Sequence, residues 1–338
     1  MAANTAKIHN LGFGFLGHHP VEELTELVCT AEELGFTSAW IAEDYFYAGA
    51  FSLASAVARS TEKIQLGIGV INPYTRHPVL SAMESAALDT VSKGRAIIGI
   101  GAANKLWIET RMGMPYSKPI TATRECVEII KGLVGQGKLT YHGSVFQVEG
   151  VELEFQPYRR DLPVYMGVKG DKALFQAGQA ADGALISAGC TLEYIPYARD
   201  LIAQGARSVG RNPDELRLAA YLPTCIRPTH QEAVDAMRPF VRRYLGLHGD
   251  KPILTCAGFD PAVLRPFREA FLAGETCPNE VTDEMVEKIV VAGTADECRA
   301  RILDYMAAGV EMPVCFEVGG DESPLEQLKS IHAHLLAD

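Results

Sequence analysis

Short apolar runs and amphipathic stretches alternate along almost the whole chain, and this alternation limits the possible folds more than any other feature. Apolar runs near residues 13, 40, 67, 98, 165, 185, 221 and 315 are each followed by apolar residues at helical spacing. Eight successive β/α units predict an α/β fold, the (β/α)8 or TIM barrel. A doubly wound parallel sheet is the alternative, but the count of eight and the lack of a mid-chain linker favour the barrel.

Two segments interrupt the alternation. Residues 139–158 are rich in β-forming side chains around Gly143 and Gly150, which predicts a β-hairpin insertion. Residues 248–282 are less periodic and contain several prolines, and we expect a mostly helical insertion there. We expect both insertions to cover the functional site. The 338 residues then form one domain, 1–338, with a barrel core large enough to fold alone.

Composition excludes several classes of function. The chain has 31 Lys and Arg against 42 Asp and Glu, a net charge of −11 without a basic cluster, so we expect no nucleic-acid partner. The eight cysteines are scattered without a C-x-x-C pair, which predicts reduced thiols and no metal site. No apolar run is long enough to span a membrane, and the first ten residues lack the apolar core of a secretory signal, so we expect a cytoplasmic protein.

Catalysis on a (β/α)8 barrel occurs at the C-terminal ends of the strands. The second strand is followed by Glu43 and Asp44, two adjacent carboxylates among aromatic residues. Burial and mutual repulsion raise the pKa of a carboxyl group, as a proton donor requires. The alternative is a solvated acidic turn in which Asp44 helps to start the next helix.

Small residues follow the third and fourth strands. Gly67 and Gly69 within a buried strand indicate a bulge or the close approach of another group, such as a flat ring. The turn Gly101–Asn104 leaves room for a planar ligand. It lacks the third glycine of a dinucleotide-binding fingerprint, so that interpretation is weak.

The fifth strand ends in the string MGVKGDK, residues 166–172, at the start of a helix. Backbone N–H groups, the helix dipole and the charge of Lys169 make this the best candidate phosphate site in the chain. Ser187, after the sixth strand, is expected to lie beside it. The alternative is an ordinary glycine loop with Asp171 as the N-cap.

Taken together, these strings resemble the luciferase-like flavin- and deazaflavin-dependent oxidoreductases, most closely the methylenetetrahydromethanopterin reductase branch. The matching segments are GVINPYTRHP, SKGRAIIGIG, LPVYMGVKG and AGQAADGALIS, which begin at Gly69, Ser92, Leu162 and Ala177. The similarity extends over essentially the whole chain.

The resemblance implies that coenzyme F420, or alternatively FMN, binds at the C-terminal mouth of the barrel. It also implies a non-prolyl cis peptide bond between Gly69 and Val70. The cofactor-binding residues expected on this basis are Gly69, Val70, Asn72, Gly101, Ala102, Ala103, Gly167, Lys169, Gly170, Asp171 and Ser187.

The chain differs from the family pattern in strand one, after strand two and in the turn after strand four, which reads GIGAAN where the family has a GIGPGD-like turn. Family members commonly carry an Asp-His pair where this chain has Glu43 and Asp44, so the proton donor expected here is Glu43, Asp44 or Tyr45. The pterin-reducing relatives carry a glutamate where this chain has Gly14, which leaves the substrate open.

The leading hypothesis is an F420-dependent oxidoreductase that transfers a hydride between the reduced deazaflavin and a small organic substrate: an imine-like compound, an activated alkene or a carbonyl compound. The alternatives are an FMN-dependent monooxygenase on the same scaffold and a non-catalytic flavin-binding barrel. By analogy with the family we also expect a homodimer.

Overall fold

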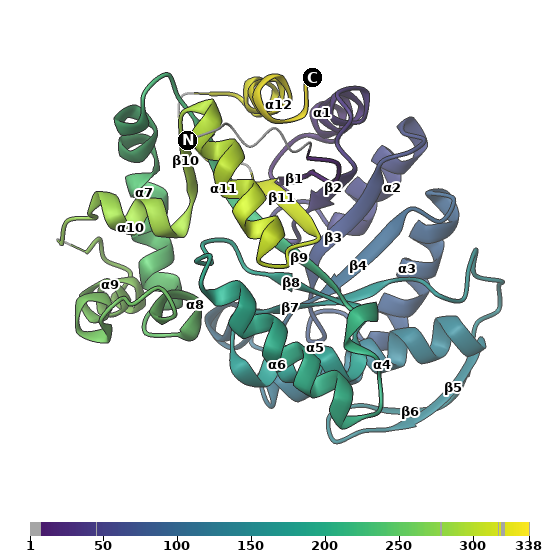
Figure 1. Cartoon of the computed structure of the whole chain (residues 1–338). Helices are drawn as coiled ribbons and strands as arrows, with labels where there is room; N and C mark the ends of the chain where they lie inside the picture. The colour runs from purple at the N-terminus through teal and green to yellow at the C-terminus, as the bar shows by residue number, and fades with distance from the viewer. Residues whose placement is uncertain (1–7, 45, 278, 317, 319–321, 338) are drawn as a thin grey trace.

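The computed structural model describes residues 8–44, 46–277, 279–316, 318 and 322–337, and it shows the predicted barrel (Figure 1). Eight parallel strands form the barrel wall: β1 (Gly12–Phe15), β2 (Ser38–Ile41), β3 (Gln65–Ile71), β4 (Ala96–Ile100), β7 (Val164–Val168), β8 (Gly183–Ile186), β9 (Arg217–Ile226) and β11 (Met312–Phe316). Each strand pairs with its neighbour, and pairing of β8 with β9, β9 with β11 and β11 with β1 closes the ring. The predicted α/β barrel is therefore confirmed, and the open doubly wound sheet is excluded.

Helices cover the outside of the barrel, as Figure 1 shows. They are α1 (Val21–Glu33), α2 (Ala50–Ser60), α3 (Pro78–Val91), α4 (Pro119–Gln136), α5 (Asp171–Ala180), α6 (Tyr194–Ser208), α7 (His230–His248), α10 (Asp283–Ile289), α11 (Ala295–Ala307) and α12 (Pro324–Ile331). Apolar residues at helical spacing form each buried face; in α1, for example, Leu24, Leu27, Val28 and Ala31 are buried. Pro78 occupies the first turn of α3, where its missing N–H costs nothing.

Aromatic side chains fill the inside of the barrel. The ring centroids of Tyr221 and Phe316 are 5.0 Å apart, and those of Trp40 and Tyr221 are 6.3 Å apart. A Cβ atom at Gly67 would lie 2.3 Å from the Trp40 ring. The flat ring expected close to Gly67 is therefore the Trp40 side chain. A ligand is not needed to explain this glycine.

The predicted hairpin consists of β5 (Lys138–His142) and β6 (Gln147–Glu152), and it lies outside α4 (Figure 1). The buried Glu125 of α4 anchors its turn: its carboxylate accepts hydrogen bonds from the backbone N–H groups of Ser144 at 2.7 Å, Val145 at 2.9 Å and Phe146 at 3.0 Å. These hydrogen bonds help to lower the pKa of Glu125 against the opposing effect of burial.

The second insertion is helical, as predicted, with α8 (Pro252–Thr255) and α9 (Pro261–Ala273). A short strand, β10 (Val291–Gly293), was not predicted; it pairs in parallel with the end of β9, beyond the closed ring. Three residues are too few to show the period of a strand. In Figure 1, α7 to α10 form a lobe at one side of the barrel.

Charged residues at the N-terminal ends of the strands are tightly paired. Arg159 forms two hydrogen bonds of 3.0 Å to the buried carboxylate of Asp89, and it also donates to the carbonyl oxygen of Ala96. Arg95 donates to four backbone carbonyl groups and to the hydroxyl group of Thr61. Such bidentate and multiple charged hydrogen bonds hold the barrel base together.

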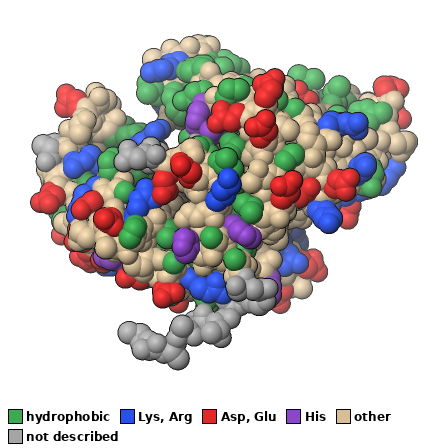
Figure 2. Space-filling model, turned by 90° about the horizontal axis from the view of Figure 1, so that it is seen from above, with side chains coloured by type: hydrophobic (Ala, Val, Ile, Leu, Met, Phe, Trp, Pro, Cys, Tyr) green, Lys and Arg blue, Asp and Glu red, His purple; other side chains and the backbone are tan. Residues whose placement is uncertain are grey.

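Among the described residues, no helix has the length and apolar character to cross a membrane. No group of three His, Cys, Asp or Glu side chains in the same residues is arranged to hold a metal ion. Figure 2 shows acidic and basic side chains interspersed over the face seen from above.

Candidate active site at the barrel mouth

The Gly69–Val70 peptide bond is cis, as the family resemblance implied. The pairing of β3 with β4 shifts register between Ile68 and Ile71, so the strand bulges at this point. The phenol of Tyr221 donates a hydrogen bond of 3.2 Å to the carbonyl oxygen of Gly69. This bulge marks the C-terminal mouth of the barrel.

The Val70 side chain explains why glycines occupy the neighbouring positions, which the sequence did not suggest. A Cβ atom at Gly101 would lie 2.4 Å from Val70 Cγ2, and one at Gly167 would lie 3.0 Å from Val70 Cγ1. A Cβ atom at Gly99 would lie 2.5 Å from the carbonyl oxygen of Ile68 and 2.9 Å from Val70 Cγ1. These three glycines make room for the Val70 side chain. The space next to their Cα atoms, which the sequence suggested for a planar ligand, is therefore filled by Val70.

Three other predicted cofactor residues lie in the turns that follow β3 and β4. The buried Asn72 accepts hydrogen bonds from the N–H groups of Tyr74 and Thr75, and it donates to the Thr75 hydroxyl group, so it shapes the turn after β3. Ala102 and Ala103 are half-buried after β4, and Ala103 has a left-handed φ of 60°.

The two adjacent carboxylates after β2 have different environments. Glu43 forms a 3.0 Å ion pair with Arg76, and it accepts a hydrogen bond from the first N–H of α2. Arg76 also pairs with Glu84 at 2.6 Å. Glu43 is thus used to join β2, α2 and α3, which disfavours it as the proton donor.

Asp44, in contrast, forms no ion pair within the part of the chain that the structure describes. Its carboxyl group is half-buried, and burial raises its pKa above the ordinary range, although the charges of Arg243 and His18 oppose this effect. Tyr45, the third predicted donor, lies outside the described residues. The geometry favours Asp44 among the donors that can be compared.

Helix α7 supplies an aromatic stripe at the mouth that the sequence did not reveal. The rings of Phe240 and Tyr244 are stacked with centroids 4.3 Å apart, and Tyr244 meets His248 edge-to-face at 5.5 Å. Phe240 and Tyr244 pack against the aromatic cluster inside the barrel. The negative charge of Asp44 contributes, after burial, to the raised pKa values of Tyr221 and Tyr244, so these phenols lie near it.

The predicted phosphate site lies where β7 and β8 end side by side. Val168 pairs with Ile186, which brings the loops after these two strands together as expected. Gly170 is the N-cap of α5, no side chain caps this helix, and a Cβ at Gly170 would meet open space. The first N–H groups of α5 are therefore accessible to an anion.

The side chains of this site differ in burial and in charge. Lys169 is half-buried and forms no ion pair within the described part of the chain, whereas Asp171 is exposed and its carboxylate would repel an anion. Asp171 can thus contribute only its backbone N–H. Ser187 is half-buried, and its own N–H approaches the Val168 carbonyl oxygen at 3.4 Å.

His248 connects the aromatic stripe to the phosphate site. Its Nε2 donates a 2.8 Å hydrogen bond to the carbonyl oxygen of Ala188, and its buried Nδ1 has no hydrogen-bond partner among the described residues. Burial and the charge of Lys169 lower the pKa of His248 to about 3, so the ring is neutral. The site therefore offers N–H donors, a cation and an unsatisfied buried nitrogen.

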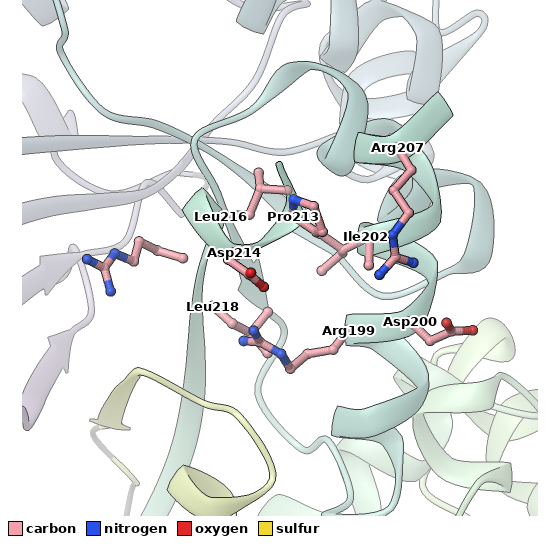
Figure 3. A pocket seen from close by; sticks show the side chains of 10 residues that line it. Arg199, Asp200, Ile202, Arg207, Pro213, Asp214, Leu216 and Leu218 are labelled. Carbon is pink, nitrogen blue, oxygen red and sulfur yellow. The ribbon is translucent and has the colours of Figure 1, made fainter. Parts of the chain in front are cut away.

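A cavity of about 270 Å³ lies elsewhere, between α6 and the beginning of β9 (Figure 3). Arg199 and Arg217 in its wall lie 4.0 Å and 3.9 Å from Glu311. The cavity opens at the N-terminal ends of the strands, opposite the mouth, and it does not share residues with the site described above.

Comparison with known proteins places this geometry in a family. The family model for luciferase-like monooxygenases matches residues 4–312. The chain belongs to the luciferase-like monooxygenase family. The 5,10-methylenetetrahydromethanopterin reductase of Methanolobus tindarius is 32% identical over 88% of this chain and 91% of its own length. The enzyme of the same name from Archaeoglobus fulgidus is also 32% identical, over 94% of this chain and 96% of its own.

A solved structure of this luciferase-like family agrees in fold. The coenzyme F420-dependent tetrahydromethanopterin reductase from Methanopyrus kandleri superposes with a TM-score of 0.85 at 28% identity, over 98% of this chain and 99% of that one. The fold is therefore shared along nearly the full length of both chains.

Proposed function

We propose that this chain is an F420-dependent oxidoreductase that transfers a hydride between reduced coenzyme F420 and a small imine-like, activated-alkene or carbonyl compound. The observation that carries the proposal is the half-buried Asp44, without an ion pair in the described residues, whose charge acts on the Tyr221 phenol that binds Gly69 at the bulge. The relatives of the chain include an F420-dependent reductase. When bound, the deazaflavin supplies the hydride.

The residues at the mouth fit such a cofactor. The open N-terminus of α5 at Gly170, with Lys169 beside it, suits a phosphate group, and the adjacent Ser187 loop borders the same place. The bulge at Val70 and the turn at Ala102 and Ala103 provide an apolar wall at the mouth. The buried Nδ1 of His248 is an acceptor to which no described residue donates, as expected beside a site that takes a polar ligand.

Asp44 holds the proton that the reaction needs. Because burial raises its pKa, a larger fraction of its carboxyl groups is protonated near neutral pH than for an exposed aspartate. The protonated carboxyl donates to the substrate atom that gains negative charge, while Tyr244 and Phe240 limit the access of water.

An anaerobic titration of the protein with F420, and separately with FMN, followed by cofactor fluorescence, tests the proposal. We expect saturable F420 binding and much weaker FMN binding. Tight FMN binding without F420 binding would support the flavin-dependent monooxygenase instead. Binding of either cofactor without turnover of any hydride acceptor would support the non-catalytic barrel.

We also propose a homodimer in the cytoplasm, on the basis of the family analogy and of the cysteine distribution. Light scattering after size-exclusion chromatography measures the mass directly: about twice the mass of one 338-residue chain supports the dimer, and the mass of a single chain contradicts it.

A further inference from the structure

The helical insertion after α7 approaches the phosphate site and brings two more cations to it. We propose that Arg268 and Lys251, together with Lys169, bind the negatively charged tail of the deazaflavin cofactor, which makes this insertion a part of the cofactor site. The proposal rests on the proposed function, because F420 carries a phosphodiester and glutamyl carboxylates beyond its ring.

Arg268 is held in place from two directions. Its Nη1 donates to the carbonyl oxygens of Gly246 at 3.0 Å and Leu247 at 3.2 Å, at the end of α7. Gly249, with a φ of 61°, lies against it, since a Cβ there would be 3.1 Å from Arg268 Cδ. Its Nε and Nη2 form no hydrogen bond within the described residues, so these donors are available to a ligand.

The insertion is fastened to the loop that follows β8. The Thr191 N–H donates to the carbonyl oxygen of Ile253 at 3.3 Å, and His248 donates to Ala188. These contacts place α8, and Lys251 immediately before it, next to the Ser187 loop. Lys251 is exposed, and its 3.6 Å ion pair with the equally exposed Asp250 contributes little energy.

The three cations lie near one another, and no carboxylate of the described residues forms an ion pair with Lys169. Burial lowers the pKa of Lys169, and the positive charges of Arg268 and Lys251 lower it further. Like charges gathered in this way repel one another, and an anion bound between them adds attractions that offset this repulsion. The open N-terminus of α5 provides for one phosphate group, so the additional cations fit a ligand with further negative charges.

The test compares two ligands that differ only in the tail: F420 and the same deazaflavin lacking the phosphate and glutamyl groups. We expect Lys251→Gln to weaken F420 binding about threefold to fivefold, as an exposed ion pair would, and Lys169→Gln to weaken it about tenfold or more. Neither change should alter the affinity for the tail-less deazaflavin by more than about twofold, and only F420 binding should weaken with added salt.

Lys63→Gln is the matched control, because it removes the same charge from an exposed residue just before β3, at the opposite end of the barrel. An unchanged F420 affinity in Lys251→Gln and Lys169→Gln would overturn the proposal. Equal losses for both ligands would also overturn it, since they indicate a structural role. If the unmodified protein binds neither ligand, the proposed function itself fails.

Discussion

The two ends of the barrel differ in how their charged side chains are paired. At the N-terminal ends of the strands, Asp89 and Arg159 form a bidentate pair, and Arg95 has five acceptors. At the C-terminal mouth, neither the half-buried Asp44 nor Lys169 forms an ion pair within the described residues, and the positive charges of Arg268 and Lys251 act on Lys169.

This difference separates stability from function. A paired buried charge holds elements together and is costly to break, whereas an unpaired one costs stability and remains free to interact with a ligand. Glu43 shows the contrast within a single turn, because it lies at the mouth yet is paired with Arg76. We therefore expect changes at the base to alter folding and changes at Asp44 to alter turnover.

The largest expected effect is that of Asp44→Asn on turnover. Without the proton donor, we expect the oxidation of reduced F420 by imines, activated alkenes or ketones to fall by about 10²- to 10⁴-fold. Binding of F420 should change by less than about twofold. Stopped-flow absorbance of the cofactor measures the rate, and retention of full activity would remove Asp44 from the mechanism.

The second prediction concerns the base of the barrel. Arg159→Met leaves the buried Asp89 carboxylate without its partner, and we expect the free energy of unfolding to fall by about 3–5 kcal/mol. Chemical denaturation measures this change. The double variant Asp89→Leu with Arg159→Met removes both charges and should regain much of the stability; a double variant no more stable than Arg159→Met contradicts this explanation.

The third prediction is that Glu43→Gln lowers stability rather than turnover, as a change at the base does, although Glu43 lies at the mouth. Loss of the charge that faces Arg76 should lower the free energy of unfolding by about 1–2 kcal/mol. Turnover of the folded enzyme should remain within a few-fold. A loss of turnover comparable with that of Asp44→Asn would assign the proton to Glu43 or to both carboxylates.

The smallest effect is a dependence of stability on pH. The folded state raises the pKa of Asp44, so its charged form opposes folding once the pH rises through that pKa. Asp44→Asn should therefore melt at a higher temperature than the unmodified protein at pH 7, and the difference should disappear below the ordinary aspartate pKa of about 3.9. A lower melting temperature at pH 7 would show that Asp44 is stabilised as an anion.

The sequence predicted the barrel because each of its strands is an apolar run between amphipathic helices, a local pattern that tertiary contacts reinforce. It also predicted that the loops at Lys169 and Ser187 are neighbours, since consecutive strands of a barrel pair. It could not show that Arg76 pairs with Glu43, because that contact joins residues 33 positions apart and depends on side-chain direction.

The sequence could not predict, for the same reason, that α7 and the helical insertion bring side chains to the mouth. Phe240, Tyr244 and His248 recur at a spacing of four, which is equally typical of a core-facing helix. Arg268 is about a hundred residues from Lys169 along the chain, and no local motif connects them. The glycines near Val70 were recognised, but only the course of the bulge shows which side chain they admit.

The protonation state of Asp44 tests the central contrast most directly. An infrared titration of the unmodified protein, with Asp44→Asn as the reference, isolates the carbonyl band of this one protonated carboxyl group. We predict a band that persists above the ordinary aspartate pKa of about 3.9. Disappearance of the band at or below the ordinary value would contradict the assignment of Asp44 as the unpaired proton donor.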